Sequence, residues 1–136
     1  MTSHTGRCLC GGVRFQIDQA LAPIQVCHCR ECQRAQGAAF AAITPVATSA
    51  LRFETGSELI TEFSSSPGKY RAFCQRCGSP LYSRRDDKPE VRRLRAGVID
   101  PPVTVPVASH AYVAEQAPWC RLADDAPRFP HAKPVS

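Results

Sequence analysis

The chain is poor in several features that common folds rely on. Its 136 residues include one methionine and one tryptophan, and no apolar run reaches the length of about 18 residues that a membrane helix needs. The N-terminus lacks the apolar stretch of a secretory signal. Helical periodicity is weak, and twelve prolines and eight glycines divide the chain into short segments. These absences argue against a helical bundle and a helical membrane protein, and we expect a cytoplasmic protein without a membrane partner.

The remaining composition is that of one globular domain built mainly from strands. With 43% hydrophobic and 21% charged residues, the chain can form one core but is too short for two domains. A short helical turn is predicted only for residues 29–36, and it is expected to end near Gly37. The aromatic side chains of Phe15, Phe53, Phe63 and Phe73 are expected in the core, and the chain from Ala126 is expected to be irregular. The predicted strands are 13–17, 38–43, 51–53, 59–63, 70–73, 80–83, 91–96 and 110–113.

The net charge of +5 raises the question of an anionic partner. The basic residues are spread along the chain, and Asp86 and Asp87 interrupt the densest group, so we do not expect nucleic acid. A solvated surface is the simpler interpretation. The alternative is a small anion-binding face for a carboxylated substrate, which needs only one or two arginines. The candidates for that role are Arg30, Arg34, Arg84 and Arg85.

Seven of the eight cysteines fall into three tight clusters, which divide into a set of four and a set of three. Thiols at C-x-C and C-x-x-C spacing in a reducing compartment favour metal binding over structural disulfides. Four thiolates close a tetrahedral zinc site, whereas three leave a position for water or substrate. The clusters are Cys8-Leu-Cys10, Cys27-His-Cys29-Arg-Glu-Cys32 and Cys74-Gln-Arg-Cys77.

The set of four combines two pairs from distant parts of the chain. Cys74 and Cys77 are followed by Gly78, which is typical of a zinc knuckle whose backbone turns to direct amide groups toward sulfur. Cys8 and Cys10 also precede glycine, but their spacing is tighter and they need a second pair to complete four ligands. Pairing them with the knuckle would close a long loop. The alternative is two unrelated pairs of reduced thiols.

The set of three, Cys27, Cys29 and Cys32, lacks the glycine of a closed knuckle. Three thiolates could bind one side of a zinc ion and leave its fourth coordination position open to an incoming thiol. The metal would lower the pKa of that thiol, so that it binds as a thiolate. The alternative is a second structural site closed by Cys120 or a histidine. His28, between two of the ligands, is a candidate for ligation or for a supporting or exposed role. Cys120 itself is interpreted as a half-buried structural thiol in preference to a metal ligand or a nucleophile.

These motifs resemble the glutathione-dependent formaldehyde-activating enzyme family, which also includes centromere protein V. A weaker block matches from Ser109 to Val113 and from Ala117 to Phe129, in which His110 and Trp119 are interpreted as packing and hydrogen-bonding residues. The stronger blocks are Gly6-Arg-Cys8-Leu-Cys10-Gly-Gly-Val-Arg-Phe15, Cys27-His-Cys29-Arg-Glu-Cys32-Gln-Arg-Ala-Gln-Gly37 and Phe73-Cys74-Gln-Arg-Cys77-Gly-Ser-Pro-Leu81.

The resemblance implies a mainly β, zinc-containing fold of the Mss4-like type. The single domain would span residues 6–129, with tails at 1–5 and 130–136. Two Zn²⁺ ions per chain are implied, the second of them labile. The structural zinc would be held by Cys8, Cys10, Cys74 and Cys77, and the second, open zinc by the catalytic residues Cys27, Cys29 and Cys32.

The implied activity is that of a carbon–sulfur lyase type of enzyme, which condenses glutathione with formaldehyde to give S-hydroxymethylglutathione. The small-molecule partner would be glutathione or a related thiol. His28 and His110 are the only evident candidates for a general base. The alternatives are a zinc-stabilised module that binds thiols without turnover, and an interaction module for protein or nucleic acid. The sequence does not define an oligomeric state.

Overall fold

The computed structural model describes residues 3–134, which pack as two compact units. The first unit contains the described residues up to Ala22 together with Thr44–Thr104. The second contains Pro23–Ile43 and the described residues from Val105 onward. Each of the two cysteine sets falls within one unit, the set of four in the first and the set of three in the second.

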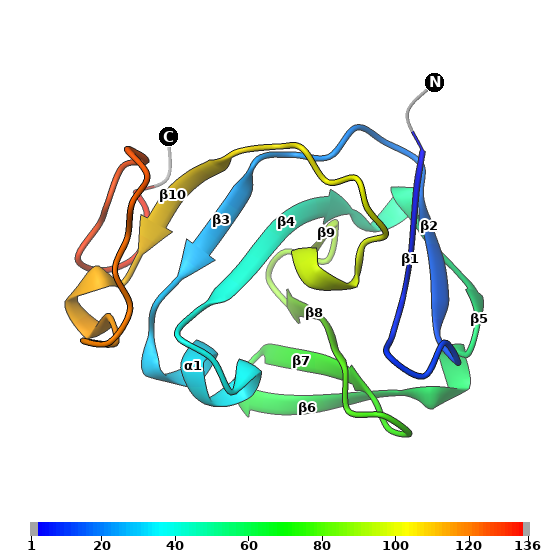
Figure 1. Ribbon diagram of the computed structural model, residues 1–136. Coiled ribbons are helices and arrows are strands. Elements are labelled where there is room, and N and C mark those ends of the chain that lie inside the picture. The colour runs from blue at the N-terminus through cyan, green and yellow to red at the C-terminus, as the bar shows by residue number, and fades with distance from the viewer. Residues whose placement is uncertain (1–2, 135–136) are drawn as a thin grey trace. The chain divides into compact units, whose positions relative to one another are not determined.

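The first unit is built from two groups of antiparallel strands (Figure 1). One group pairs β1 (His4–Arg7) with β2 (Arg14–Ile17), and β2 with β5 (Leu51–Thr55). The other is a meander of β6 (Ile60–Ser66), β7 (Lys69–Cys74), β8 (Pro80–Arg85) and β9 (Val91–Arg95). Single turns of 3-10 helix lie at Thr48–Ala50, Ser57–Leu59 and Ala96–Val98.

The core of the first unit is formed mainly by inward-facing positions of these strands, together with residues of the segments that connect them. Phe15 and Ile17 on β2 alternate with the more exposed Arg14 and Gln16, as a half-buried strand requires. Cys8 and Cys74 belong to this core and are almost fully buried, so two metal-binding candidates are also packing residues. The buried core residues are Cys8, Val13, Phe15, Ile17, Val46, Ala72, Cys74, Leu81, Tyr82, Leu94 and Ile99.

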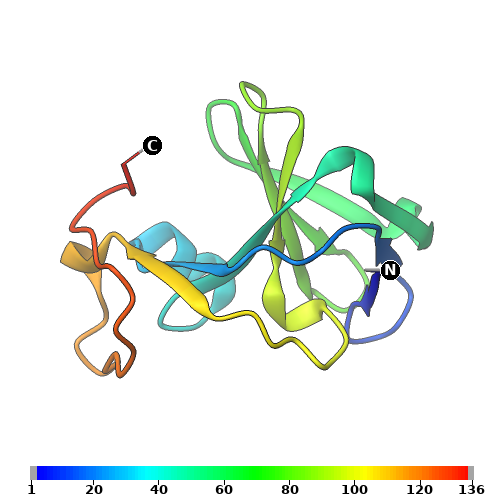
Figure 2. The same ribbon diagram turned by 90° about the horizontal axis from the view of Figure 1, so that it is seen from above.

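The second unit centres on β3 (Ile24–Cys27), which pairs antiparallel with β4 (Ala41–Ala47) and parallel with β10 (Val107–Ala111). Figure 2 shows β3 and β10 running alongside each other. The helix α1 (Arg30–Gln36) follows β3, and a 3-10 turn at Val113–Glu115 follows β10. The boundary between the units falls within β4.

The helix α1 begins and ends where the sequence indicates. Cys29 is its N-cap, and the sulfur accepts a hydrogen bond from the amide of Cys32 at 3.3 Å. The helix ends at Gly37, whose amide donates to the carbonyl of Gln33 at 2.8 Å. Cys29 and Cys32 are thereby joined by the first turn of the helix.

The mainly β fold predicted from the sequence is confirmed, with some differences in detail. The strands β1 and β3 were not among the predicted segments, and β4 continues through Pro45. The prediction that Phe63 is a core residue is wrong, because its side chain is 63% exposed. Alternation along β6 gives Glu62 the face shared with Tyr82 and Arg84, to which Glu62 is hydrogen-bonded, so Phe63 points to the opposite face.

Several other expectations concern the ends and the environment of the chain. No helix within residues 3–134 is long and apolar enough to span a bilayer. The domain limits at residues 6 and 129 stay a prediction, and the outermost parts of the predicted tails, residues 1–2 and 135–136, lie outside the described residues. Residues 127–134 form no helix or strand, as predicted, but this segment is hydrogen-bonded to β10 through the Phe129 amide and the His110 carbonyl at 2.8 Å.

Gly56 supplies a stringent test of the packing in the first unit. Its φ is +80°, and an added Cβ would lie 2.1 Å from the backbone oxygen of Gly12. We expect Gly56→Ala to lower the free energy of unfolding by more than about 1 kcal/mol, measured by urea denaturation. Gly97→Ala is the matched control, because a Cβ there meets no atom within 4 Å; it should shift stability by less than about 0.5 kcal/mol. Equal effects at both glycines would contradict this packing.

Candidate metal centres

The four cysteines predicted to share one site come together in the first unit. Cys8 and Cys10 lie on the connection between β1 and β2. Cys74 is the last residue of β7, and Cys77 lies on the connection from β7 to β8. Their four sulfur atoms all lie within 4.8 Å of one another. The structure therefore pairs the two distant cysteine motifs, and the alternative of two unrelated thiol pairs is wrong.

The geometry of the four sulfurs fits zinc. The Sγ atoms of Cys8 and Cys10 are 3.5 Å apart, and those of Cys10 and Cys74 are 3.9 Å apart. Zinc–sulfur bonds of about 2.3 Å in a tetrahedron give sulfur–sulfur distances of about 3.8 Å. The sulfur separations are thus those that a zinc ion requires, and the residues present fit zinc.

Hydrogen bonds to the sulfurs of Cys10 and Cys77 favour their thiolate forms, whereas burial raises the pKa of Cys74. The amides of Gly12 and Val13 approach the sulfurs of Cys10 and Cys8 at 3.4 and 3.3 Å. The Gly12 amide, followed by the Arg76 guanidinium at 3.3 Å, holds the pKa of Cys10 below its usual range. The hydroxyl of Ser79, 3.3 Å from the Cys77 sulfur, is the main cause that lowers the pKa of Cys77 to about 5. Thiolates are the forms that bind metal.

The knuckle turn explains how two ligands so close in sequence converge. Gly78 has a φ of +79°, a backbone conformation that glycine adopts without strain. Its amide donates to the carbonyl of Cys74 at 2.7 Å, and the amide of Cys74 donates to the carbonyl of Ser79 at 3.0 Å. The prediction that glycine turns the chain behind the second cysteine of the pair is confirmed.

The three remaining clustered cysteines converge in the second unit. Cys27 ends β3, Cys29 caps α1, and Cys32 is buried in the first turn of the helix. Their sulfurs lie within 4.8 Å of one another, and this ligand group contains neither His28 nor Cys120. Among residues 3–134 the site is therefore a set of three sulfurs, and a fourth ligand from Cys120 or a histidine is not brought to it.

The protonation of these three thiols depends on one another. Hydrogen bonding to the sulfurs of Cys29 and Cys32 is the main cause that raises the pKa of Cys27 well above its usual range. Three adjacent thiols cannot all ionise without a cation, since like charges at this distance repel. A bound divalent ion would release the protons and stabilise three thiolates together. The donor set accordingly fits a thiophilic metal such as zinc.

His28 lies between two of these ligands in the sequence, but its ring is not part of the three-sulfur group and contacts His110 instead. The ring is fully buried, and its Nε2 lies 2.9 Å from Nδ1 of His110. His110 in turn lies 3.0 Å from the carboxylate of Asp124. Burial is the main cause that lowers the pKa of His28, so the ring is neutral at neutral pH. Sequence reasoning identified His28 and His110 as candidates but not their contact, because 82 residues separate them.

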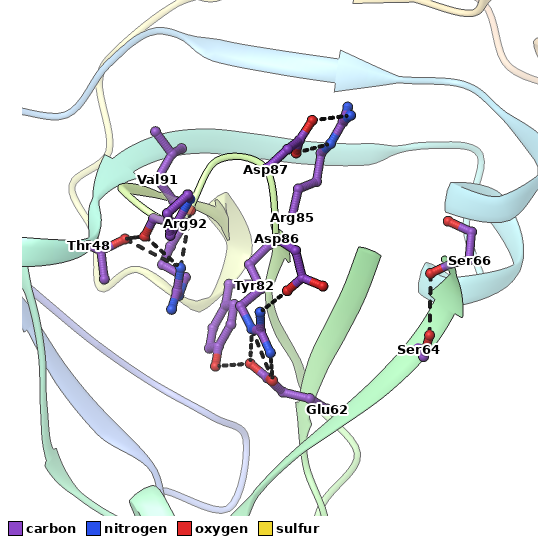
Figure 3. A network of polar contacts seen from close by, with 12 residues as sticks. Thr48, Glu62, Ser64, Ser66, Tyr82, Arg85, Asp86, Asp87, Val91 and Arg92 are labelled. Carbon is purple, nitrogen blue, oxygen red and sulfur yellow. Dashed lines mark hydrogen bonds and ion pairs between the residues drawn. The ribbon is translucent and has the colours of Figure 1, made fainter. Parts of the chain in front are cut away.

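Two of the arginines considered for substrate binding are engaged with carboxylates of the first unit (Figure 3). Arg84 forms a bidentate pair with Glu62, at 2.7 Å for the shortest contact, and also contacts Asp86 at 3.1 Å. Arg85 pairs with Asp87 at 2.8 Å. The same glutamate accepts a hydrogen bond from Tyr82 at 2.7 Å. These pairs give Arg84 and Arg85 a structural explanation. Arg85 and Asp87 lie on the solvated surface that the sequence predicted, whereas the Arg84 side chain is only 24% exposed.

The other candidates from the sequence have simpler positions. The backbone amide of Arg30 donates to the carboxylate of Glu115 at 3.0 Å, and its side chain bonds to Gln33. Arg34 is exposed near the end of α1. His110 is a packing and hydrogen-bonding residue, as interpreted, whereas Trp119 is 73% exposed and the packing role expected for it is wrong. Cys120 is half-buried and belongs to neither cluster.

Comparison with known proteins finds a matching family and a solved structure of similar fold. The profile of the family described as glutathione-dependent formaldehyde-activating enzyme matches residues 3–115. Among solved structures, the chain is similar to a crystal structure of a Rhodobacter sphaeroides protein, with a TM-score of 0.61 and 24% sequence identity. The likeness covers 76% of this chain and 99% of the other, and it shows a shared fold.

Replacing Cys74 tests the four-sulfur site. We expect Cys74→Ser to lower the zinc content by one ion per chain, counted by native mass spectrometry. The midpoint of thermal unfolding should fall by about 10 °C or more, because a structural metal contributes directly to folding. Cys120→Ser is the matched control and should change neither quantity appreciably. Retention of full zinc content by Cys74→Ser would show that this cysteine is not a ligand.

Proposed function

Because the chain belongs to the glutathione-dependent formaldehyde-activating enzyme family, we propose that it is a zinc-dependent enzyme of the carbon–sulfur lyase type. Its reaction would be the reversible addition of glutathione, or a closely related thiol, to formaldehyde. The residues that carry this chemistry are Cys27, Cys29 and Cys32. The four cysteines of the first unit would hold a structural zinc.

One observation carries the proposal, the difference in ligand number between the two cysteine clusters. Four sulfurs in the first unit make a complete tetrahedral donor set, whereas three in the second leave one position for another ligand. A zinc ion bound there would lower the pKa of an additional thiol and so supply a thiolate at neutral pH. Closed sites serve structure, while open sites are typical of catalysis.

The reaction needs no redox partner and no leaving group. The sulfur of the incoming thiol forms a bond to the carbonyl carbon, and the carbon–oxygen π bond breaks. The proton released from the thiol is taken up by the oxygen, which becomes the hydroxyl of the S-hydroxymethyl product. All atoms of both reactants are retained, and the reverse step cleaves the carbon–sulfur bond.

The chain contributes a fixed arrangement of sulfurs to this reaction. Cys29 and Cys32 are held by the first turn of α1, where the Cys32 amide donates to the Cys29 sulfur. Gln33 in the same helix donates to the carbonyl of His28 at 2.8 Å, which restrains the segment between Cys27 and Cys29. Such restraint reduces the reorganisation needed when a thiol binds. A reduced, cytoplasmic location is consistent with a site that requires free thiols.

The alternative of a nucleic-acid module is disfavoured by the pairing of basic side chains. Arg52 contacts Asp18 at 2.8 Å, in addition to the pairs made by Arg84 and Arg85. Arginines that already contact carboxylates contribute less to binding phosphate, because those contacts must be broken or shared. A thiol-binding module without turnover uses the same three cysteines and is distinguished by experiment.

The test is the exchange rate between free and hydroxymethylated glutathione, measured by NMR at equilibrium so that the uncatalysed rate can be subtracted. We expect wild-type protein to increase this rate. Cys29→Ser should reduce the protein-dependent part by about 100-fold, because it removes one of three ligands from the open site. The far-UV circular dichroism spectrum should stay unchanged.

The Cys120→Ser variant controls for the loss of a thiol outside both clusters, and it should retain the wild-type exchange rate. Unchanged exchange in Cys29→Ser would contradict the assignment of the three cysteines. If wild-type protein binds glutathione but leaves the exchange rate at its uncatalysed value, the protein is a thiol-binding module and the enzymatic proposal fails.

A further inference from the structure

A continuous chain of hydrogen bonds joins Asp124 to His28 through His110 within the second unit. Nε2 of His110 lies 3.0 Å from each carboxylate oxygen of Asp124, and Nδ1 of the same ring lies 2.9 Å from Nε2 of His28. His28 is 0% exposed and His110 is 2% exposed, whereas the Asp124 side chain is 40% exposed. This series of hydrogen bonds thus runs from Asp124 at the surface to His28 in the middle of the Cys27–Cys29 segment.

Asp124 determines which nitrogen atom donates in each hydrogen bond of this series. A carboxylate only accepts hydrogen bonds, so Nε2 of His110 must carry the proton that it donates. A neutral imidazole has one N–H, which leaves Nδ1 of His110 as an acceptor for the Nε2 proton of His28. Nδ1 of His28 is then a bare lone pair, and this buried atom has no hydrogen-bond partner in the part of the chain that the structure describes. The tautomer of His28 is therefore fixed only by the hydrogen bond of its Nε2 to His110.

His28 is restrained at three points, two on its backbone and one on its ring. Its amide donates to the carbonyl of Ala111 at 3.0 Å, and its carbonyl accepts from Nε2 of Gln33 at 2.8 Å. The ring bond to His110 is the third restraint. Because His28 is joined directly to Cys27 and Cys29, these restraints orient the two sulfurs.

Asp124 is itself held in place by its surroundings. The amide of Ala126 donates to its carboxylate at 2.9 Å, and the guanidinium of Arg128 donates to its backbone carbonyl at 2.8 Å. The same segment is anchored on β10, where the His110 amide donates to the carbonyl of Pro127 at 2.9 Å. This segment lies beyond residue 115, where the match to the family profile ends.

Packing alone does not account for three polar groups at this position. Two imidazoles in the interior of a small unit are costly to desolvate unless their hydrogen bonds are satisfied, and apolar rings would fill the same space without that cost. One acceptor remains unsatisfied even so. What the polar chain adds is a defined ring orientation and tautomer.

We propose that Asp124 and His110 are positioning residues for the Cys27, Cys29 and Cys32 site, acting through the ring of His28. The proposal rests on the proposed function only in taking the three sulfurs to be a metal site. Without Asp124, His110 can carry its proton on either nitrogen, and one tautomer removes the acceptor that His28 requires. The three sulfurs then lose a restraint, and their affinity for metal should fall about 10- to 100-fold.

The experiment counts zinc per chain by native mass spectrometry while a chelator is titrated into the full-length, reduced protein. Wild-type protein should lose its two ions in separate steps, with the three-cysteine site losing its ion first. Asp124→Ala should shift the first step to a chelator concentration at least about tenfold lower and leave the second step unchanged. Asp124→Asn, which keeps an oxygen acceptor for His110, should recover most of the difference. Asp125→Ala, an exposed neighbour, should match wild type.

A double-mutant cycle then tests whether Asp124 acts through His110. In a His110→Phe background, Asp124→Ala should have no further effect on the first step, because the chain is already broken. The proposal is overturned if Asp124→Ala leaves the first step within twofold of wild type, if both zinc ions are lost together, or if the two substitutions are additive. It is also overturned if wild-type protein binds only one ion. Two ions without glutathione turnover would defeat the proposed reaction alone.

Discussion

Convergence of the sulfurs of Cys8, Cys10, Cys74 and Cys77 within 4.8 Å is the constraint on which the first unit depends. One pair lies on the connection from β1 to β2, and the other lies at the end of β7 and on the turn that follows it, so the site joins both groups of strands. Cys8 and Cys74 are also core residues, packed with Phe15, Ile17 and Leu81. In a small unit with few large apolar side chains, metal binding can supply folding free energy that hydrophobic burial does not.

The second unit is organised differently, because its interior contains polar side chains. His28, Gln33, Ser109 and His110 are buried, and the two histidines and Gln33 are hydrogen-bonded to other parts of the same unit. A polar interior of this kind contributes little net stability but specifies which groups face one another. This distinction suits the roles inferred for the two clusters. In those proposed roles, the four-sulfur set would stabilise the fold, and the three-sulfur set would need accurate orientation.

The surface charges illustrate why sequence position is a poor guide to the availability of a side chain. Arg84 and Arg85 were reasonable candidates for binding a carboxylated substrate, yet their partners are Glu62 on a different strand and Asp87 two residues away. The exposure of Phe63 has the same origin. Glu62 is hydrogen-bonded to Tyr82 and Arg84, and the alternation of β6 leaves its neighbour on the other face.

The sequence by itself determined the cysteine sets, the mainly β fold and the family, because ligand spacing, short strand patterns and turn glycines are local properties. The separation of seven cysteines into four and three could be read from their spacing, and the structure brings together the same two groups. Only the tertiary structure decided that Arg84 is paired with Glu62, that Phe63 is exposed, and that Asp124 and His110 reach His28. These outcomes depend on contacts between residues far apart in the chain, whose geometry no local pattern encodes.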